Sequence, residues 1–281
     1  MIYRIWNRFT ELAQYECELP ANVAFGDARQ HLRYAVEQAS KVGASLCGAY
    51  LGGAPLSGIS LVKTDLEHAF LQGADLRFAS IMGSNLTRTD LVNVRLEGSN
   101  IVNSTFDHAR MSGAALSKAR LEGTMFEGAS LDGADFRSAE LDTVVLTEAV
   151  LRNADFSDAR LNSVWLDGTD LAGARFLRAD LSHGEFSGSV LAGIDFTEAY
   201  LAGADLSEMD LSRARLCRAD LRGANLARTR LRWAWFDGAD LSGADLTNAD
   251  LGNASLRGAV LTQAKFVSAC LAGTWLDEAD V

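Results

Sequence analysis

The segment "LSGADLTNADLGNASLRGAVL" (residues 241–261) carries a leucine at every fifth position and an alanine two residues before each leucine. An α-helix advances about 100° per residue, so a five-residue step would spread these leucines around the helix instead of placing them on one face. A β-strand does not fit either, because an odd step moves each successive leucine to the opposite face. The period therefore belongs to a larger repeating structure.

The same register runs without insertion or deletion from Leu46 to Val281, which gives 48 consecutive five-residue repeats with an apolar centre. The residue two positions before the centre is mostly Ala, Ser or Thr. Larger residues stand there at Ile59, Val94, Val144, Val164, Ile194 and Met209. The residue just before the centre is Asp fifteen times and Asn three times. We expect the centre and the small residue to face a tight interior, and the other three positions to face water.

Phenylalanine shows that the sides of the repeating unit are not equivalent. It occupies nine centres, all with numbers that end in 6: Phe106, Phe126, Phe136, Phe156, Phe176, Phe186, Phe196, Phe236 and Phe266. Alternate sides therefore differ, and a coil must have an even number of sides, which excludes a coil of fifteen residues. Ten residues are too few to enclose a core, so twenty remain. A twenty-residue coil places Phe136, Phe156, Phe176 and Phe196 in one stack.

The repeat approximates A(D/N)LxG and resembles the pentapeptide-repeat family over residues 46–281. The resemblance implies an all-β solenoid, namely a right-handed quadrilateral β-helix in which each pentapeptide forms one side. The length then corresponds to about twelve coils of twenty residues, roughly 4.8 Å apart. Each coil needs its neighbours to bury its leucines.

Residues 1–45 do not follow the repeat and predict a small α+β cap, made of a hairpin and a helix, ahead of the β-helix at 46–281. Residues 3–9 and 13–19 have the composition of two strands. Asp27 can cap a helix that ends before Gly43, with an apolar stripe formed by Ala28, Leu32, Ala35, Val36 and Ala39. The pieces "NRFT", "AVEQA" and "GASL" resemble the head of some phage and prophage pentapeptide-repeat proteins. A cap would cover the open core and unpaired backbone groups of the first coil.

The sequence predicts no catalytic, cofactor or metal site. Four cysteines form no CxxC pair and are expected to be reduced: Cys17, Cys47, Cys217 and Cys270. Four scattered histidines have no Cys, Asp or Glu at ligand spacing: His31, His68, His108 and His183. Gly-rich fragments arise from the repeat itself, so they do not indicate a phosphate loop. We expect a protein that is not an enzyme.

Composition and the first residues indicate the expected cellular compartment. Hydrophobic residues make up 48% of the chain, yet no stretch approaches 18 uninterrupted apolar residues, so no membrane span is predicted. The first residues, "MIYRIWNRFTELAQYECEL", carry charges where a secretory signal needs an apolar run. The expected compartment is the cytoplasm.

The net charge of −11 lies entirely on the repeats, which carry 32 acidic and 21 basic residues. Residues 179–212 hold seven acidic residues and no Lys or Arg: Asp180, Glu185, Asp195, Glu198, Asp205, Glu208 and Asp210. This acidic surface should repel nucleic acid. Some members of the family imitate duplex DNA and bind DNA gyrase or topoisomerase IV, so a DNA-mimicking modulator of the quinolone- or toxin-protection type is one hypothesis. The alternative is that the motif alone accounts for the acidity.

The next coil carries an arginine belt: Arg213, Arg215, Arg218, Arg222, Arg228, Arg230 and Arg232. Within this span Asp220 is the one acidic residue that opposes them. A protein that mimics the phosphate charge of DNA is not expected to carry such a belt. The spacing places Trp233 and Trp235 one coil after Arg213 and Arg215, where cation–π pairs are expected. Because Trp and Arg are enriched at binding hot spots, we favour a non-catalytic scaffold or adaptor whose partner-binding patch is the belt with these two tryptophans.

Two further surface expectations follow from the register. Arg175, Asp195 and Arg215 fall in one column of residues twenty apart and predict ion pairs between coils. The final coil has no counterpart of the C-terminal dimerising helix found in several gyrase-binding members of the family. Trp275 and Leu276 near that end therefore predict a tail-to-tail homodimer.

Overall fold

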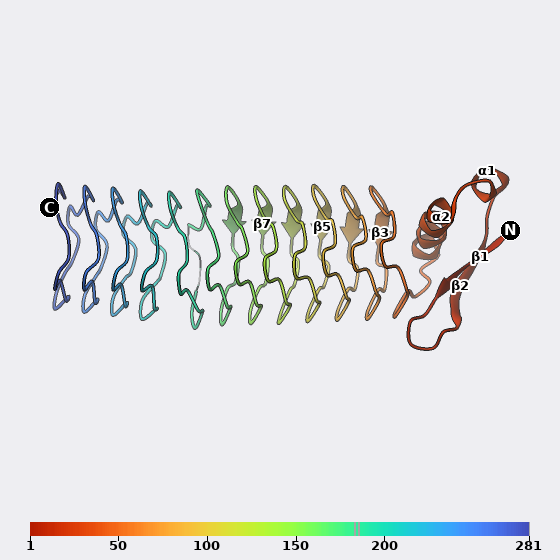
Figure 1. Cartoon of the computed structure of the whole chain (residues 1–281), viewed down its shortest axis with the longest axis horizontal. Coiled ribbons are helices and arrows are strands. Elements are labelled where there is room, and N and C mark those ends of the chain that lie inside the picture. The colour runs from red at the N-terminus through yellow and green to blue at the C-terminus, as the bar shows by residue number, and fades with distance from the viewer. Residues whose placement is uncertain (183, 185, 281) are drawn as a thin grey trace. The chain divides into compact units, whose positions relative to one another are not determined.

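The chain is a β-solenoid with parallel pairing and a small N-terminal α/β cap (Figure 1). The computed structural model describes residues 1–182, 184 and 186–280, and it divides into two compact units, Met1–Asp135 and Phe136–Val281. Three residues named above, His183, Glu185 and Val281, lie outside the described residues.

Residues twenty apart pair in both units, as the sequence predicts. The first unit contains four short strands that pair in parallel in chain order: β3 (Ser60–Val62), β4 (Ser80–Met82), β5 (Asn100–Val102) and β6 (Arg120–Glu122). The second contains β7 (Glu140–Asp142) and β8 (Arg160–Asn162), which pair with the same offset. Single-residue parallel bridges extend this offset as far as Val260 and Asp280.

In a coil such as residues 60–79, parallel bridges to the next coil recur at four places, five residues apart. Ser60 pairs with Ser80 in a strand, and the next three bridges start from Asp65, Phe70 and Asp75. Most sides end in a tight turn, as where the backbone N–H of Ala74 donates to the Leu71 carbonyl at 2.9 Å and Gly73 between them has φ +65°. This left-handed corner explains the frequent Gly two residues after the centre.

The core is filled by the centre residues. Eight of the nine centre phenylalanines are fully buried, and Phe266 is partly buried because residues 262–280 pair only with the preceding coil in the described chain. The ring centroids of Phe136 and Phe156 are 4.6 Å apart, those of Phe156 and Phe176 4.8 Å, and those of Phe176 and Phe196 5.4 Å. The predicted unbroken stack is confirmed.

Several buried hydroxyl groups in the core donate to backbone carbonyls. In one inward column of the first unit, Ser84 Oγ donates to the Leu61 carbonyl at 3.2 Å, and Thr124 Oγ1 donates to the Ile101 carbonyl at 3.3 Å. A small residue at this position therefore packs as Ala or can donate a hydrogen bond as Ser or Thr, although the buried hydroxyl of Ser99 has no partner among the described residues.

The cap contains β1 (Ile2–Trp6) antiparallel to β2 (Ala13–Glu18), then α1 (Ala21–Ala24) and α2 (Ala28–Lys41). The first strand ends earlier than the predicted residue 9, because the Asn7 side-chain oxygen accepts hydrogen bonds from the N–H groups of Phe9 and Thr10 and turns the chain. The short α1 was not predicted. No helix of the described residues is long and apolar enough to cross a membrane.

Helix α2 forms as expected at both ends. Asp27 Oδ1 accepts from the N–H of Gln30 at 2.9 Å, and Gly43 adopts φ +68° beyond the last turn. Of the predicted apolar stripe, Ala35, Val36 and Ala39 are fully buried, whereas Leu32 is half-buried and Ala28 is exposed. Ala28 is the first residue of the helix and lies a full two turns from the buried segment.

The cap covers the start of the repeat within the first unit. The Arg8 N–H donates to the Gly48 carbonyl and the Tyr50 N–H donates to the Trp6 carbonyl, both at 2.8 Å. The hydroxyls of Ser40 and Thr64 lie 2.6 Å apart in a buried hydrogen bond between α2 and the repeat. Hairpin and helix thus supply partners to backbone and core groups that an open coil would leave in water.

Truncation of a stacked ring tests the core. We expect Phe156→Ala to lower the free energy of unfolding by about 3 to 5 kcal/mol, because it removes a fully buried ring packed between two others. Phe266→Ala, at a partly buried centre, should cost clearly less. Denaturant titration followed by circular dichroism measures both values, and equal losses for the two variants would contradict the stacked arrangement.

Candidate protein-binding surface

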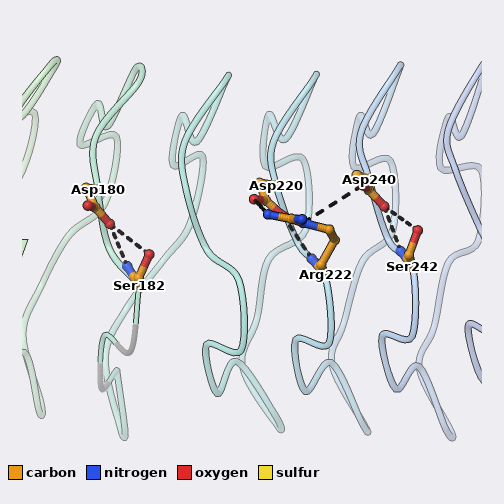
Figure 2. Close-up of polar contacts among 6 residues, drawn as sticks. All are labelled: Asp180, Ser182, Asp220, Arg222, Asp240 and Ser242. Atoms are coloured by element: carbon orange, nitrogen blue, oxygen red, sulfur yellow. Dashed lines mark hydrogen bonds and ion pairs between the residues drawn. The ribbon is translucent and has the colours of Figure 1, made fainter.

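The aspartates before the centres have a local structural role at the start of each side. Asp180 Oδ1 accepts from the Ser182 N–H at 3.1 Å and from its hydroxyl at 2.8 Å, and Asp240 Oδ1 accepts from the Ser242 N–H at 2.9 Å (Figure 2). A carboxylate or amide oxygen that bonds the backbone two residues on stabilises a turn. Much of the negative charge is therefore part of the repeat's own turn chemistry.

Arg222 adds an arginine to this arrangement. Its guanidinium donates to the two carboxylate oxygens of Asp220 at 2.7 and 2.6 Å, and it lies 4.0 Å from Asp240 one coil on (Figure 2). These bonds lower the pKa of Asp220 against the opposing effect of burial. The pKa of Asp245 is lowered by hydrogen bonds from Thr247, without any arginine contact.

Most of the arginine belt is paired with carboxylates that stacking brings from neighbouring coils. Four of these pairs reach back one coil: Arg215 to Asp195 at 3.8 Å, Arg218 to Glu198 at 3.1 Å, Arg228 to Glu208 at 2.7 Å and Arg230 to Asp210 at 3.6 Å. Arg232 reaches forward to Asp250 at 3.4 Å. The expectation that Asp220 alone opposes the belt is wrong, because it counted only neighbours in the sequence.

The acidic surface and the arginine belt consequently form one mixed surface. Of the predicted acidic residues that are described, four are within ion-pair distance of an arginine one coil on: Asp195, Glu198, Glu208 and Asp210. Asp180 and Asp205 accept hydrogen bonds from neutral groups, Ser182 and Asn225 among them. In the predicted column, Arg215 lies 3.8 Å from Asp195, while Arg175 lies 3.9 Å from Asp155.

Two arginines and two tryptophans line an open groove of about 490 Å³, here called the Trp–Arg groove: Arg213, Arg215, Trp233 and Trp235. The two indoles are 52% and 54% exposed. The expected cation–π pairs are not formed: in the described chain, guanidinium groups lie over rings only at Arg8 and Arg257. The guanidinium of Arg215 lies instead 3.8 Å from Asp195, and about half of each indole remains exposed to solvent.

The predicted C-terminal residues are accessible. Trp275 is 54% exposed and Leu276, a centre residue, is 42% exposed. The Arg257 guanidinium lies 4.7 Å from the centroid of the Trp275 ring, a contact that sequence reasoning missed. The register could have predicted it: Arg257 directly follows a centre and Trp275 directly precedes a centre of the next coil, which gives an offset of eighteen residues. Arg152 and Asp170 pair at the same offset, at 2.6 Å.

The described residues contain no group of three or more His, Cys, Asp or Glu side chains arranged to hold a metal ion. All four cysteines are free. Burial raises the pKa of the Cys217 thiol, which lies against the Trp235 carbonyl at 3.8 Å.

The repeat identified above matches family models along most of the chain. A model described as "Pentapeptide repeats (8 copies)" matches residues 42–77, 79–117, 185–216, 194–232, 205–243 and 244–281, and one described as "Pentapeptide repeat region" matches 99–176. The chain belongs to the pentapeptide-repeat family. Among proteins with curated functions, no relative matches it.

Several solved pentapeptide-repeat structures are similar to the chain. HetL of the cyanobacterium Nostoc sp. strain PCC 7120, a protein involved in the regulation of heterocyst differentiation, is 30% identical, with 88% of this chain and 93% of HetL covered and a TM-score of 0.31. A trypsin-treated variant of QnrB1, a plasmid-mediated fluoroquinolone resistance protein, is 22% identical, with 70% and 88% covered and a TM-score of 0.36. A thylakoid-lumen protein of Arabidopsis thaliana is 34% identical, with 37% and 65% covered and a TM-score of 0.21.

The turn carboxylates predict an acid-sensitive pentapeptide repeat. The pKa of Asp75, Asp158, Asp210, Asp220 and Asp245 is lowered in the folded state. Between the folded and the unfolded pKa values, the unfolded chain binds more protons than the folded chain. These carboxylates therefore stabilise the fold above the unfolded pKa of about 3.9, and their contribution is lost as pH falls through their folded pKa values. The midpoint of thermal unfolding should fall steeply below about pH 4.

Asp220→Asn isolates one of these groups, since the amide keeps an acceptor oxygen but does not titrate. We expect this variant to be less stable than wild type at pH 7, with the difference shrinking as pH falls through the folded pKa of Asp220. Calorimetry across this range measures it. A difference that stays constant with pH would show that the Asp220 charge does not contribute.

Proposed function

We propose that this pentapeptide-repeat protein is a non-catalytic protein-binding scaffold or adaptor. In this proposal residues 46–281 form a right-handed quadrilateral β-helix of about twelve coils, and residues 1–45 act as its cap. The observation that carries it is the Trp–Arg groove, in which two half-exposed indoles stand beside arginines on a backbone fixed by pairing between coils. Exposed Trp and Arg side chains on a rigid frame are favourable anchors for a protein partner.

The lining of the groove supports binding over catalysis. Indole and guanidinium groups provide apolar contact, stacking and charged hydrogen bonds. General acid–base and nucleophilic catalysis use imidazole, carboxylate, thiol or hydroxyl groups instead. The groove presents neither a carboxylate nor an imidazole among its four lining residues.

The alternative is a DNA-mimicking modulator of DNA gyrase or topoisomerase IV. The net charge of −11 favours it, and one similar structure, QnrB1, is named as a fluoroquinolone resistance protein. That likeness, at 22% identity, concerns the fold alone. The ion pairs weigh against a mimic, because arginines lie beside four of the seven predicted acidic residues and reduce the continuous negative charge that a duplex presents.

A pull-down with groove variants tests the scaffold. We expect the wild-type chain to retain a protein partner in the cytoplasmic extract of its host, and the double variant Trp233→Ala/Trp235→Ala to lose it while keeping its circular dichroism spectrum. Trp165→Ala is the matched control, since this indole is 39% exposed and lies outside the groove. In a parallel assay, the purified wild-type chain should leave DNA supercoiling by gyrase unaffected. Inhibition of supercoiling that vanishes at high salt would favour the DNA mimic instead.

Self-association through the last coil is a separate part of the proposal, with a second copy of the chain as the partner. Leu271 and Leu276 are centre residues that are 41% and 42% exposed, whereas most centres are fully buried. Burial of such surface favours association. Analytical ultracentrifugation of the 281-residue chain at tens of micromolar should show a dimer, and Leu276→Lys should give a monomer. Phe78→Ser, a change at an exposed ring elsewhere, should leave the dimer intact. A wild-type monomer would contradict the proposal.

A further inference from the structure

Trp233 occupies a backbone position that its side chain disfavours. Its φ is +61°, and it stands in a column of left-handed corners that holds glycine at Gly173, Gly193 and Gly273. A positive φ disfavours bulky side chains in general, but this fold repeats it at its corners, where Phe78 (φ +57°) and Arg213 (φ +62°) share it. What distinguishes Trp233 is exposure, because about half of this large apolar side chain is in water.

Trp235 stands just beyond the same corner, separated from Trp233 by the fully buried Ala234. Its backbone pairs with Arg215 in the preceding coil. The two indoles therefore flank one corner of one coil, and Arg213 and Arg215 flank the same corner of the coil before it. Coils are about 4.8 Å apart, and an extended peptide rises about 3.3 Å per residue, so neighbouring side chains of one peptide can reach both coils.

Arg213 differs from the other arginines at its turn position. Arg218 and Arg228 each pair with a glutamate twenty residues earlier, Glu198 and Glu208. Twenty residues before Arg213 the chain has Gly193, and no carboxylate of the described residues lies within ion-pair distance of its guanidinium. Arg213 thus offers a free guanidinium at the edge of two exposed indoles.

We propose that the Trp–Arg groove binds an extended segment of another protein that carries an Asp or Glu next to an aromatic, leucine or proline side chain. The carboxylate would accept hydrogen bonds from Arg213, and the apolar side chain would pack between the two indoles. This inference rests on the proposed scaffold function and names the chemistry of its partner. Nucleic acid fits less well, because Asp195, Glu198 and Asp210 lie within the neighbouring coils and would repel a chain of phosphates.

Selection from a random peptide library displayed on phage tests this chemistry without knowledge of the partner. The wild-type chain is the target, and Trp233→Ala/Trp235→Ala serves for counter-selection. We expect enriched peptides to place Asp or Glu beside Phe, Trp, Leu or Pro. A synthetic peptide of this kind should bind wild type and Trp165→Ala equally by isothermal titration calorimetry, and the double variant at least tenfold more weakly.

Charge reversal identifies the role of Arg213. Arg213→Glu should weaken the selected peptide at least tenfold, and a peptide with Lys in place of the acidic residue should recover binding to this variant. The indole N–H resonances of Trp233 and Trp235, assigned from the single variants, should shift on titration, whereas that of Trp165 should not.

Three outcomes would overturn the inference: no enrichment over the double variant, enrichment without acidic residues, or binding of labelled single-stranded DNA that the groove variants abolish. The scaffold itself is judged separately by the pull-down. If the groove variants lose the captured protein but no acidic peptide is selected, the scaffold stands and the proposed chemistry of its partner is wrong.

Discussion

The backbone hydrogen bonds between residues about twenty positions apart are the constraint on which the rest of the structure depends. The N–H of a centre such as Leu71 donates to the carbonyl of Asp90, and the N–H of Asp90 donates back to Ala69, so the two bonds together make one parallel bridge to the next coil. One inserted residue would shift every later centre out of the core. The uninterrupted register of the sequence is the direct counterpart of this pairing.

Exposed side chains inherit the same geometry. Because columns are set by the backbone, residues at offsets of eighteen and twenty meet on the surface, and ion pairs such as Arg228–Glu208 and Arg152–Asp170 join residues that are distant in sequence. A single pair of this kind contributes little, since at least its arginine is largely in water. Together they intermix the charges of neighbouring coils, which is why a segment that is purely acidic in sequence does not form a purely acidic surface.

The interior could be predicted from sequence in detail, and the surface only in part. The Phe136–Phe196 stack follows from the twenty-residue register, and the Asp27 cap follows from the free N–H groups at the start of a helix. The register places Arg215 next to both Asp195 and Trp235. An exposed ion pair and an exposed cation–π contact differ in free energy by less than about 1 kcal/mol, so the sequence does not decide between them. The helix α1 has four residues, too few to show a periodic pattern from which it could be predicted. Register therefore places Trp233 and Trp235 beside Arg213 and Arg215, and their role in binding a partner stays a prediction.

The twenty-residue offset also defines the natural unit of change in such a chain. Loss of a single residue disrupts the pairing of everything that follows, whereas loss or gain of twenty leaves every column in place and only alters which rows are adjacent. Removing the coil that holds Arg213 and Arg215 would set Trp233 and Trp235 directly against Gly193 and Asp195. A modular duplication or deletion can thus rewrite the recognition surface in one step, while the hydrogen bonds of the core are rebuilt unchanged.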